Sequence, residues 1–208
     1  MDLINKYFSL SDKQEADFKK LLVLYPKWNA QINLISRKDI ENLEERHLLH
    51  SLAIAKFLSF KKGTHILDLG CGGGFPGIML AILFPDVQLT LMDGRNKKIM
   101  VVNDIIEKLS LKNAIGIKGR AEETKGAIYD YVVTRAVATI DKLQMWTQHL
   151  IKEEQINARP NGIIALKGGN IKTEVTALKN GDYTEIVPIN SYFQEEFFEE
   201  KFILYLQH

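Results

Sequence analysis

A glycine-rich segment at residues 67–77 (LDLGCGGGFPG) follows an apolar run and is the clearest candidate for chemistry in the chain. Glycine has no Cβ and adopts positive φ at little cost, so such a loop lets a ligand approach the backbone closely. Asp68 precedes Gly70 by two residues and places a carboxylate beside the loop. Loops after parallel strands are the usual ligand sites of open α/β sheets. The segment therefore predicts a small-molecule site, with Gly72 and Gly74 as further contacts.

Two classes of cofactor fit a loop of this kind. Read from Gly72, the letters match the G-x-G-x-x-G pattern of dinucleotide sites, but in the frame set by Gly70 the third glycine is replaced by Phe75. The Asp68 carboxylate would repel a pyrophosphate and attract the sulfonium and ammonium groups of S-adenosylmethionine. Asp93, at the end of the segment LTLMD, can accept hydrogen bonds from ribose hydroxyls in either case. The residues favour S-adenosylmethionine over NAD(P), and a loop that serves only as a tight turn is the structural alternative.

The elements that must position these residues alternate along the chain after residue 60. Strands are expected at 64–70, 87–93, 114–118, 129–135 and 162–167, and helices at 76–84, 96–110, 139–152 and 171–179. This alternation predicts a parallel sheet covered on both faces. The last two apolar segments, 182–193 and 201–207, have no helix between them and predict an antiparallel pair. The expected fold is α/β: a doubly wound, Rossmann-like, mostly parallel seven-stranded sheet with a terminal antiparallel hairpin.

The first part of the chain has a helical pattern instead. Ser11 and Gln14 have the spacing of a capping box, and apolar residues then recur at helical intervals. We expect residues 1–60 to form N-terminal helices packed on a core domain of residues 61–208.

A second N-terminal helix is expected over residues 37–58, with Asp39 as its cap. His47 and His50 lie three residues apart on it, but the neighbouring sequence supplies no obvious third and fourth ligand for a metal. We interpret both as packed helix residues and expect no metal. Arg46 and His47 are alternative candidates for contact with RNA.

Composition and charge narrow the class of protein. The chain has 208 residues, 46% hydrophobic and 25% charged, with one cysteine and a net charge of +1. The longest apolar run, at 77–84, is too short to cross a bilayer, and the N-terminus lacks the pattern of a signal peptide. We therefore expect a cytoplasmic protein with no membrane association.

Charge is distributed unevenly along the chain. Residues 95–120 hold seven Lys and Arg against two acids, and residues 182–208 hold six acids against one Lys. The basic stretch is either an ordinary solvated helix face or a patch that faces RNA phosphates.

Six segments along nearly the whole chain carry a family resemblance: KWNAQINLISRKD (27–39), ERHLLHS (45–51), LDLGCGGGFPGIMLAILFP (67–85), GRAEE (119–123), YDYVVTRAVA (129–138) and NGIIALKGG (161–169). Together they resemble the bacterial small-subunit (16S) ribosomal RNA guanine-N7 methyltransferase G family, also called glucose-inhibited division protein B. GFPG after the glycine loop, followed by the later segments, is specific to that family, whereas the loop alone is typical of all class I methyltransferases.

The resemblance implies an enzyme that uses S-adenosylmethionine to methylate N7 of one guanine in 16S rRNA of the small ribosomal subunit. It implies that Gly70 and Phe75 contact the cofactor, that Ala121 and Glu122 flank its adenine, and that Arg135 lies at the catalytic pocket.

Arg135 is the expected catalytic residue, and it is also counted among the cofactor contacts. Arginine pairs well with guanine O6 and with phosphate oxygens, so we expect it to hold one of these. The alternative is a structural salt bridge to Asp68 or Glu122. Lys167 and Gly168 are further candidates for phosphate contact, or simply a strand terminus.

Two other functions stay open at this point. One is an NAD(P)-dependent oxidoreductase on the same fold, and the other is a non-catalytic protein that binds RNA or the ribosome. The expected partner is the small ribosomal subunit, and the expected oligomeric state is a monomer.

Overall fold

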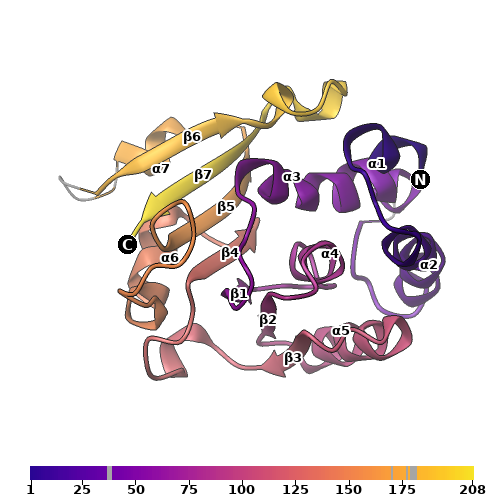
Figure 1. The fold of residues 1–208 in the computed structure, drawn as a ribbon, viewed down its shortest axis with the longest axis horizontal. Helices are drawn as coiled ribbons and strands as arrows, with labels where there is room; N and C mark the ends of the chain where they lie inside the picture. Colours follow the sequence, from indigo (N-terminus) through magenta and orange to yellow (C-terminus); the bar gives the residue numbers. More distant parts are fainter. Residues whose placement is uncertain (37–38, 170, 177, 179–181) are drawn as a thin grey trace.

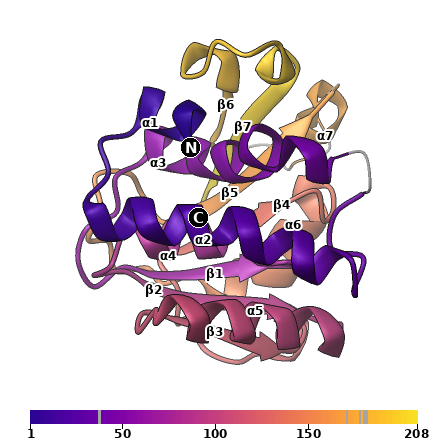
Figure 2. The same cartoon turned by 90° about the vertical axis from the view of Figure 1, so that its right-hand side faces the viewer.

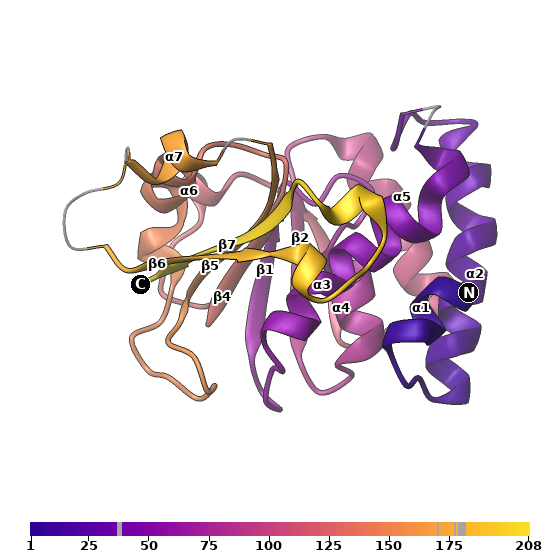
Figure 3. The same cartoon turned by 90° about the horizontal axis from the view of Figure 1, so that it is seen from above.

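A seven-stranded sheet separates two layers of helices (Figures 1 and 3). This computed structural model describes residues 1–36, 39–169, 171–176, 178 and 182–208. The strands are β1 (His65–Leu69), β2 (Gln88–Asp93), β3 (Ala114–Lys118), β4 (Tyr131–Arg135), β5 (Gly162–Gly168), β6 (Thr184–Pro188) and β7 (Lys201–Gln207). Their order is β3-β2-β1-β4-β5-β7-β6.

The strand pairing confirms the predicted fold class. β1 to β5 pair in parallel, whereas β7 is antiparallel to both of its neighbours, β5 and β6. The chain runs outward from β1 to β3 and then returns to β4 on the other side of β1. The carboxyl ends of β1 and β4 therefore form the crevice where ligands of such sheets bind.

The helices divide between the two faces. They are α1 (Asp2–Tyr7), α2 (Asp12–Asn29), α3 (His50–Phe57), α4 (Gly77–Leu83), α5 (Asn96–Leu109), α6 (Ile140–Thr147) and α7 (Lys172–Thr176). Helices α1 to α5 lie on one side of the sheet and α6 and α7 on the other (Figure 3), and α2 to α5 overlie the sheet in Figure 2. The predicted end of the last helix falls partly on residues outside the described ones.

Alternation of side chains along the buried strands explains the two layers. Ile66, Val133 and Ile164 belong to one hydrophobic cluster, and their sequence neighbours Leu67 and Val132 belong to the other. Successive side chains of a strand point to opposite faces, so a strand covered on both faces is apolar throughout. None of the helices in the described ranges has the length and apolar character needed to cross a membrane.

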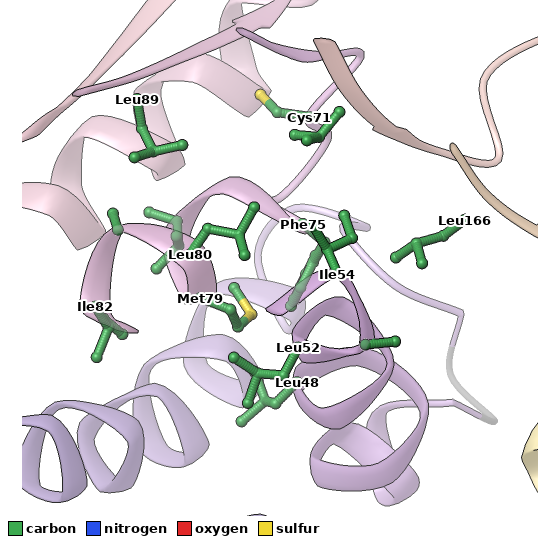
Figure 4. Close-up of a cluster of buried hydrophobic side chains, with 14 of the residues drawn as sticks. Leu48, Leu52, Ile54, Cys71, Phe75, Met79, Leu80, Ile82, Leu89 and Leu166 are labelled. Atoms are coloured by element: carbon green, nitrogen blue, oxygen red, sulfur yellow. The ribbon is translucent and has the colours of Figure 1, made fainter. Parts of the chain in front are cut away.

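The N-terminal helices pack on the sheet domain through its larger cluster. Leu48, Leu52 and Ile54 lie with Phe75 and Met79 in this cluster, close to the glycine loop (Figure 4). Its other members include Ile4, Phe18, Leu21 and Tyr25. The predicted capping box at the start of α2 is confirmed, since both of its hydrogen bonds are present. The domain boundary near residue 60 stays a prediction.

The second N-terminal helix differs from the prediction. A 3₁₀ turn (Ile40–Asn42) and a π-helix (Glu44–Leu49) precede α3, and the first two residues of the predicted helix lie outside the described ones. Asp39 makes no capping hydrogen bond. Its carboxylate instead accepts hydrogen bonds from the Ser36 hydroxyl and from Arg46, which compete with the backbone for it.

Candidate functional site

The glycine loop has the backbone conformation that its residues predict. Gly70, Gly72 and Gly74 all have positive φ, at 67°, 56° and 99°. The N–H of Gly70 donates to the Met92 carbonyl at 2.8 Å, so the loop is tied to the end of β2. A Cβ at Gly70 would lie 2.5 Å from a methyl group of Val137, in the segment that follows β4. The loop is thus held closely between β2 and the β4–α6 connection.

A cavity of about 390 Å³ opens at this end of the sheet. Its lining comes from the ends of β1 and β2, from the segments that follow β2, β3 and β4, and from α6: Leu69, Gly70, Met92, Asp93, Gly94, Arg95, Gly119, Arg120, Ala121, Glu122, Val137 and Trp146. Four of the predicted cofactor residues meet here, namely Gly70, Asp93, Ala121 and Glu122. We call this space the donor cavity.

Asp93 is fixed by two backbone hydrogen bonds. Its Oδ2 accepts from the N–H of Gly72 at 3.0 Å, and its Oδ1 accepts from the N–H of Arg95 at 2.8 Å. An ionised carboxylate accepts about four hydrogen bonds, so each oxygen keeps capacity for one more donor. A pair of vicinal hydroxyls on a ligand in the donor cavity fits this capacity.

Asp68 is placed differently from the expectation of a carboxylate that faces the loop. Its side chain is fully buried in β1 and is not part of the donor-cavity lining. One carboxyl oxygen accepts from the N–H of Gly77 at 2.7 Å, at the start of α4, and the other has no partner among the described residues. Burial raises the pKa of Asp68 to about 7, against the opposing effects of the Gly77 N–H and of Arg135. Any effect of Asp68 on the cofactor is therefore exerted through the loop or through space.

Phe75 is buried and does not line the donor cavity either. Its ring stacks on Tyr25 of α2 at 4.5 Å between centroids, and the guanidinium of Arg135 lies 4.8 Å from the ring centroid. The Tyr25 hydroxyl donates a hydrogen bond of 2.9 Å to the carbonyl of Gly73. The N-terminal helix thus supports the glycine loop directly, a contact that the sequence pattern did not predict because Tyr25 reads only as a core residue.

Arg135 lies at the end of β4 and is held by the π-helix. It donates to the Arg46 carbonyl at 3.3 Å and to Nδ1 of His47 at 2.9 Å. Burial lowers the pKa of Arg135 to about 10, which still leaves it charged at neutral pH. Among the described residues no carboxylate lies within salt-bridge distance of Arg135, so the alternative of a salt bridge to Asp68 or Glu122 is wrong.

A second cavity, of about 290 Å³, has Arg135 in its wall. Its lining joins the π-helix region to the ends of β4, β5 and β7: Asp39, Arg46, His47, His50, Arg135, Ala136, Leu166, Lys167, Gly168, Phe197 and Lys201. Ala136 lines this cavity and its neighbour Val137 lines the donor cavity, so the two spaces lie on either side of one short segment. Ala136 has φ of 55°, the left-handed region that non-glycine residues seldom adopt. We call the second space the acceptor cavity.

Several polar atoms at the acceptor cavity lack partners within the described part of the chain. They are Nε of Arg46, Nε2 of His47 and Nε2 of His50. The guanidinium of Arg135 can only donate, so Nδ1 of His47 must accept and the His47 proton sits on Nε2. Burial lowers the pKa of His47 to about 3, with a further effect of Arg135 in the same direction, so this histidine is neutral. A buried donor without a partner is costly, so these atoms are available to a hydrogen-bond acceptor that enters the acceptor cavity.

The remaining candidates have structural partners. Lys167 pairs with Glu174 at 2.8 Å and donates to the Ala138 carbonyl, so it holds the β4–α6 connection. His50 packs edge-on against Phe197 at 5.6 Å. No group of three or more His, Cys, Asp or Glu suited to a metal ion occurs within the described ranges.

Trp146 and Phe197 are among the contributors to the cavities that sequence reasoning missed. Trp146 of α6 reaches the donor cavity, and Phe197, in the 3₁₀ turn Glu196–Phe198 before β7, reaches the acceptor cavity. Neither belongs to a motif, and only the packing of α6 and of the β6–β7 connection brings them to the sheet end.

The fold is that of the class I S-adenosylmethionine-dependent methyltransferases. A SAM-dependent methyltransferase from Aquifex aeolicus superposes with a TM-score of 0.57 at 15% identity, covering 83% of this chain and 98% of that one. Precorrin-6y C5,15-methyltransferase from Geobacter metallireducens superposes with a TM-score of 0.58 at 14% identity, covering 85% and 93%. At such identities the likeness is one of fold.

Sequence comparison defines the family. The family model for rRNA small subunit methyltransferase G matches residues 14–191. The ribosomal RNA small subunit methyltransferase G of Bacteroides thetaiotaomicron is 47% identical over 208 residues, which is 100% of both chains. The one of Flavobacterium johnsoniae is 45% identical over 207 residues, 99% of this chain and 97% of that one. The chain belongs to the rRNA small subunit methyltransferase G family, as its motifs predicted, and it is a methyltransferase rather than an oxidoreductase or a non-catalytic binding protein.

Proposed function

We propose that the chain transfers the methyl group of S-adenosylmethionine to N7 of one guanine in 16S rRNA of the small ribosomal subunit. The observation that carries this proposal is the pair of cavities on either side of Ala136 and Val137. One has the residues expected for an adenosyl cofactor, and the other has the arginine expected for the acceptor. A methyl group at the boundary between them would lie within reach of a base.

The residues of the donor cavity fit the cofactor in their chemistry. Asp93 keeps two acceptor positions for the ribose hydroxyls, and Ala121, Glu122 and the apolar side chain of Trp146 share the same cavity and would hold the adenine. Gly70 leaves the loop backbone close to the ligand, and Gly72 orients Asp93 through its N–H. Gly74 and Phe75 shape the loop from beneath rather than by direct contact.

The chemistry asks little of the protein beyond placement. The cofactor supplies a methyl group on a sulfonium; the lone pair of guanine N7 forms the new N–C bond while the S–C bond breaks. N7 carries no hydrogen, so no general base is needed. Arg135, fixed by Arg46 and His47, orients the guanine through O6, next to N7. Correct placement alone can supply several kcal/mol of the barrier reduction.

Localisation and assembly follow from this assignment. We propose that the protein acts in the cytoplasm, where ribosomal RNA is found. We also propose that the protein acts as a monomer.

Modification mapping tests the proposal. Small subunits from cells that lack the enzyme would be incubated with labelled S-adenosylmethionine and the protein, and the modified base located by mass spectrometry and by primer extension after borohydride and aniline cleavage of the RNA at N7-methylguanine. The expected result is N7-methylguanine at a single position of 16S rRNA. Label on another base or atom, or none, would overturn the proposal. Binding of NAD(P) in place of S-adenosylhomocysteine would overturn the cofactor assignment as well.

A further inference from the structure

The acceptor cavity has one carboxylate among basic side chains. Of the described residues in its wall, Arg46, Arg135, Lys167 and Lys201 are cationic, and Asp39 is the single acid. An acid in the wall weakens the binding of RNA phosphates, because the carboxylate repels them. The acid therefore points to a ligand group that donates hydrogen bonds.

Asp39 is held in place and charged. Its Oδ2 accepts from the Ser36 hydroxyl at 2.6 Å, and its Oδ1 accepts from Nη1 of Arg46 at 3.0 Å. The Ser36 bond, and next the Arg46 bond, lower the pKa of Asp39 below its usual value. Each oxygen keeps a free lone pair, since an ionised carboxylate accepts about four hydrogen bonds in total. The side chain is 37% exposed, so a ligand in the cavity can reach it.

Guanine is the base whose edge matches this arrangement. Its N1–H and N2–H donors are adjacent and can pair with the two oxygens of one carboxylate, while O6, between N1 and N7, needs a donor. Adenine differs at both positions: its N1 is an acceptor where guanine has the N1–H donor, and its 6-amino group is a donor where guanine has the O6 acceptor. Methylation at N7 leaves the base positively charged, and a nearby carboxylate stabilises that charge.

We propose that Asp39 is the specificity-determining residue of the acceptor cavity and accepts hydrogen bonds from N1–H and N2–H of the guanine, while Arg135 donates to O6. This assignment rests on the proposed guanine acceptor. Arg46 then has a positioning role, because its guanidinium aims the Asp39 carboxylate and its carbonyl holds Arg135.

Inosine separates the Asp39 contact from the rest of the reaction. It keeps N7, O6 and N1–H and lacks only the N2 amino group. Small subunits would be reconstituted with 16S rRNA that carries guanine or inosine at the mapped position, and kcat/KM measured for each. For the wild-type enzyme we expect guanine to be favoured about tenfold or more, the discrimination that one good bidentate base contact provides. A wild-type ratio near one would overturn the proposal without any variant.

Variants then show which residue is responsible for the preference for guanine over inosine. Asp39→Asn should lower kcat/KM for guanine about tenfold and bring the ratio of guanine to inosine close to one. Arg46→Gln, which removes the ion pair but keeps the acid, should lower activity and retain most of the ratio. Asp86→Asn, at an exposed turn before β2, is the matched control and should change neither value.

The outcomes separate the two levels of inference. If Asp39→Asn lowers activity equally on guanine and inosine, Asp39 acts only through Arg46 or through the fold, and the specificity assignment is wrong. If the wild-type enzyme methylates neither acceptor at N7, the proposed function itself fails. Binding of S-adenosylhomocysteine to each variant, by calorimetry, verifies that the donor cavity is intact.

Discussion

Replacing Asp68 by asparagine tests whether the buried carboxyl is uncharged in the folded protein. Burial raises its pKa from 3.8 to about 7. The folded state therefore holds this proton more tightly than the unfolded state, so the contribution of Asp68 to stability is complete below pH 3.8 and is lost as the pH rises through about 7. One pKa unit corresponds to about 1.4 kcal/mol, so the free energy of unfolding falls by about 4 kcal/mol across this window through Asp68 alone.

The Asp68→Asn variant cannot titrate at this position and keeps a carbonyl oxygen for the N–H of Gly77. Its free energy of unfolding minus that of the wild type should therefore increase with pH, by more than about 2 kcal/mol between about pH 5 and about pH 8. Other titrating groups cancel in this difference. Urea unfolding followed by the fluorescence of Trp28 and Trp146, at constant ionic strength, measures it. Asp86→Asn, an exposed acid in a turn, is the control and should give a flat difference.

Two results would refute the reasoning. A difference that stays constant with pH would mean that Asp68 is ionised in the fold and that Arg135 offsets the cost of burial. A difference that decreases with pH would mean that the charge stabilises the fold, as in an ordinary ion pair.

Three further changes probe the loop and the two cavities. Gly70→Val places a Cβ 2.5 Å from Val137 at a positive φ, so S-adenosylhomocysteine affinity should fall at least about tenfold by calorimetry, whereas Gly63→Ala, at a positive φ in open space, should not affect it. Tyr25→Phe removes the hydroxyl that supports the glycine loop and should lower the free energy of unfolding by about 1 kcal/mol in urea titrations; an unchanged value would show that the hydrogen bond contributes nothing. Arg135→Ala should reduce turnover by about a hundredfold in the methylation assay and leave cofactor affinity nearly unchanged, and a loss mainly in cofactor binding would contradict its role at the acceptor.

The sequence determined the sheet because its strand signals are local. Apolar segments of strand length, separated by helical patterns, leave a parallel sheet as the compact solution, and the absence of a helix between β6 and β7 decides their antiparallel pairing. The conformation of the glycine loop was also predictable from the sequence, because the positive φ angles at Gly70, Gly72 and Gly74 favour glycine. The predicted cofactor residues Asp93, Ala121 and Glu122 lie together at one end of the sheet, because parallel strands all deliver their carboxyl ends to the same edge.

Whether a residue of these motifs lines a cavity or lies in the core depends on the tertiary structure. Asp68 and Phe75 belong to the same motif as Gly70, yet alternation along β1 and the turn of the loop direct them into the core beneath the cavity rather than into it. The sequence predicts Asp39 as a helix cap. In the structure it lines the acceptor cavity, because the chain there forms a 3₁₀ turn and a π-helix. These positions depend on contacts between segments that are far apart in the sequence. The spacing of residues along the chain does not indicate which distant segments will be in contact.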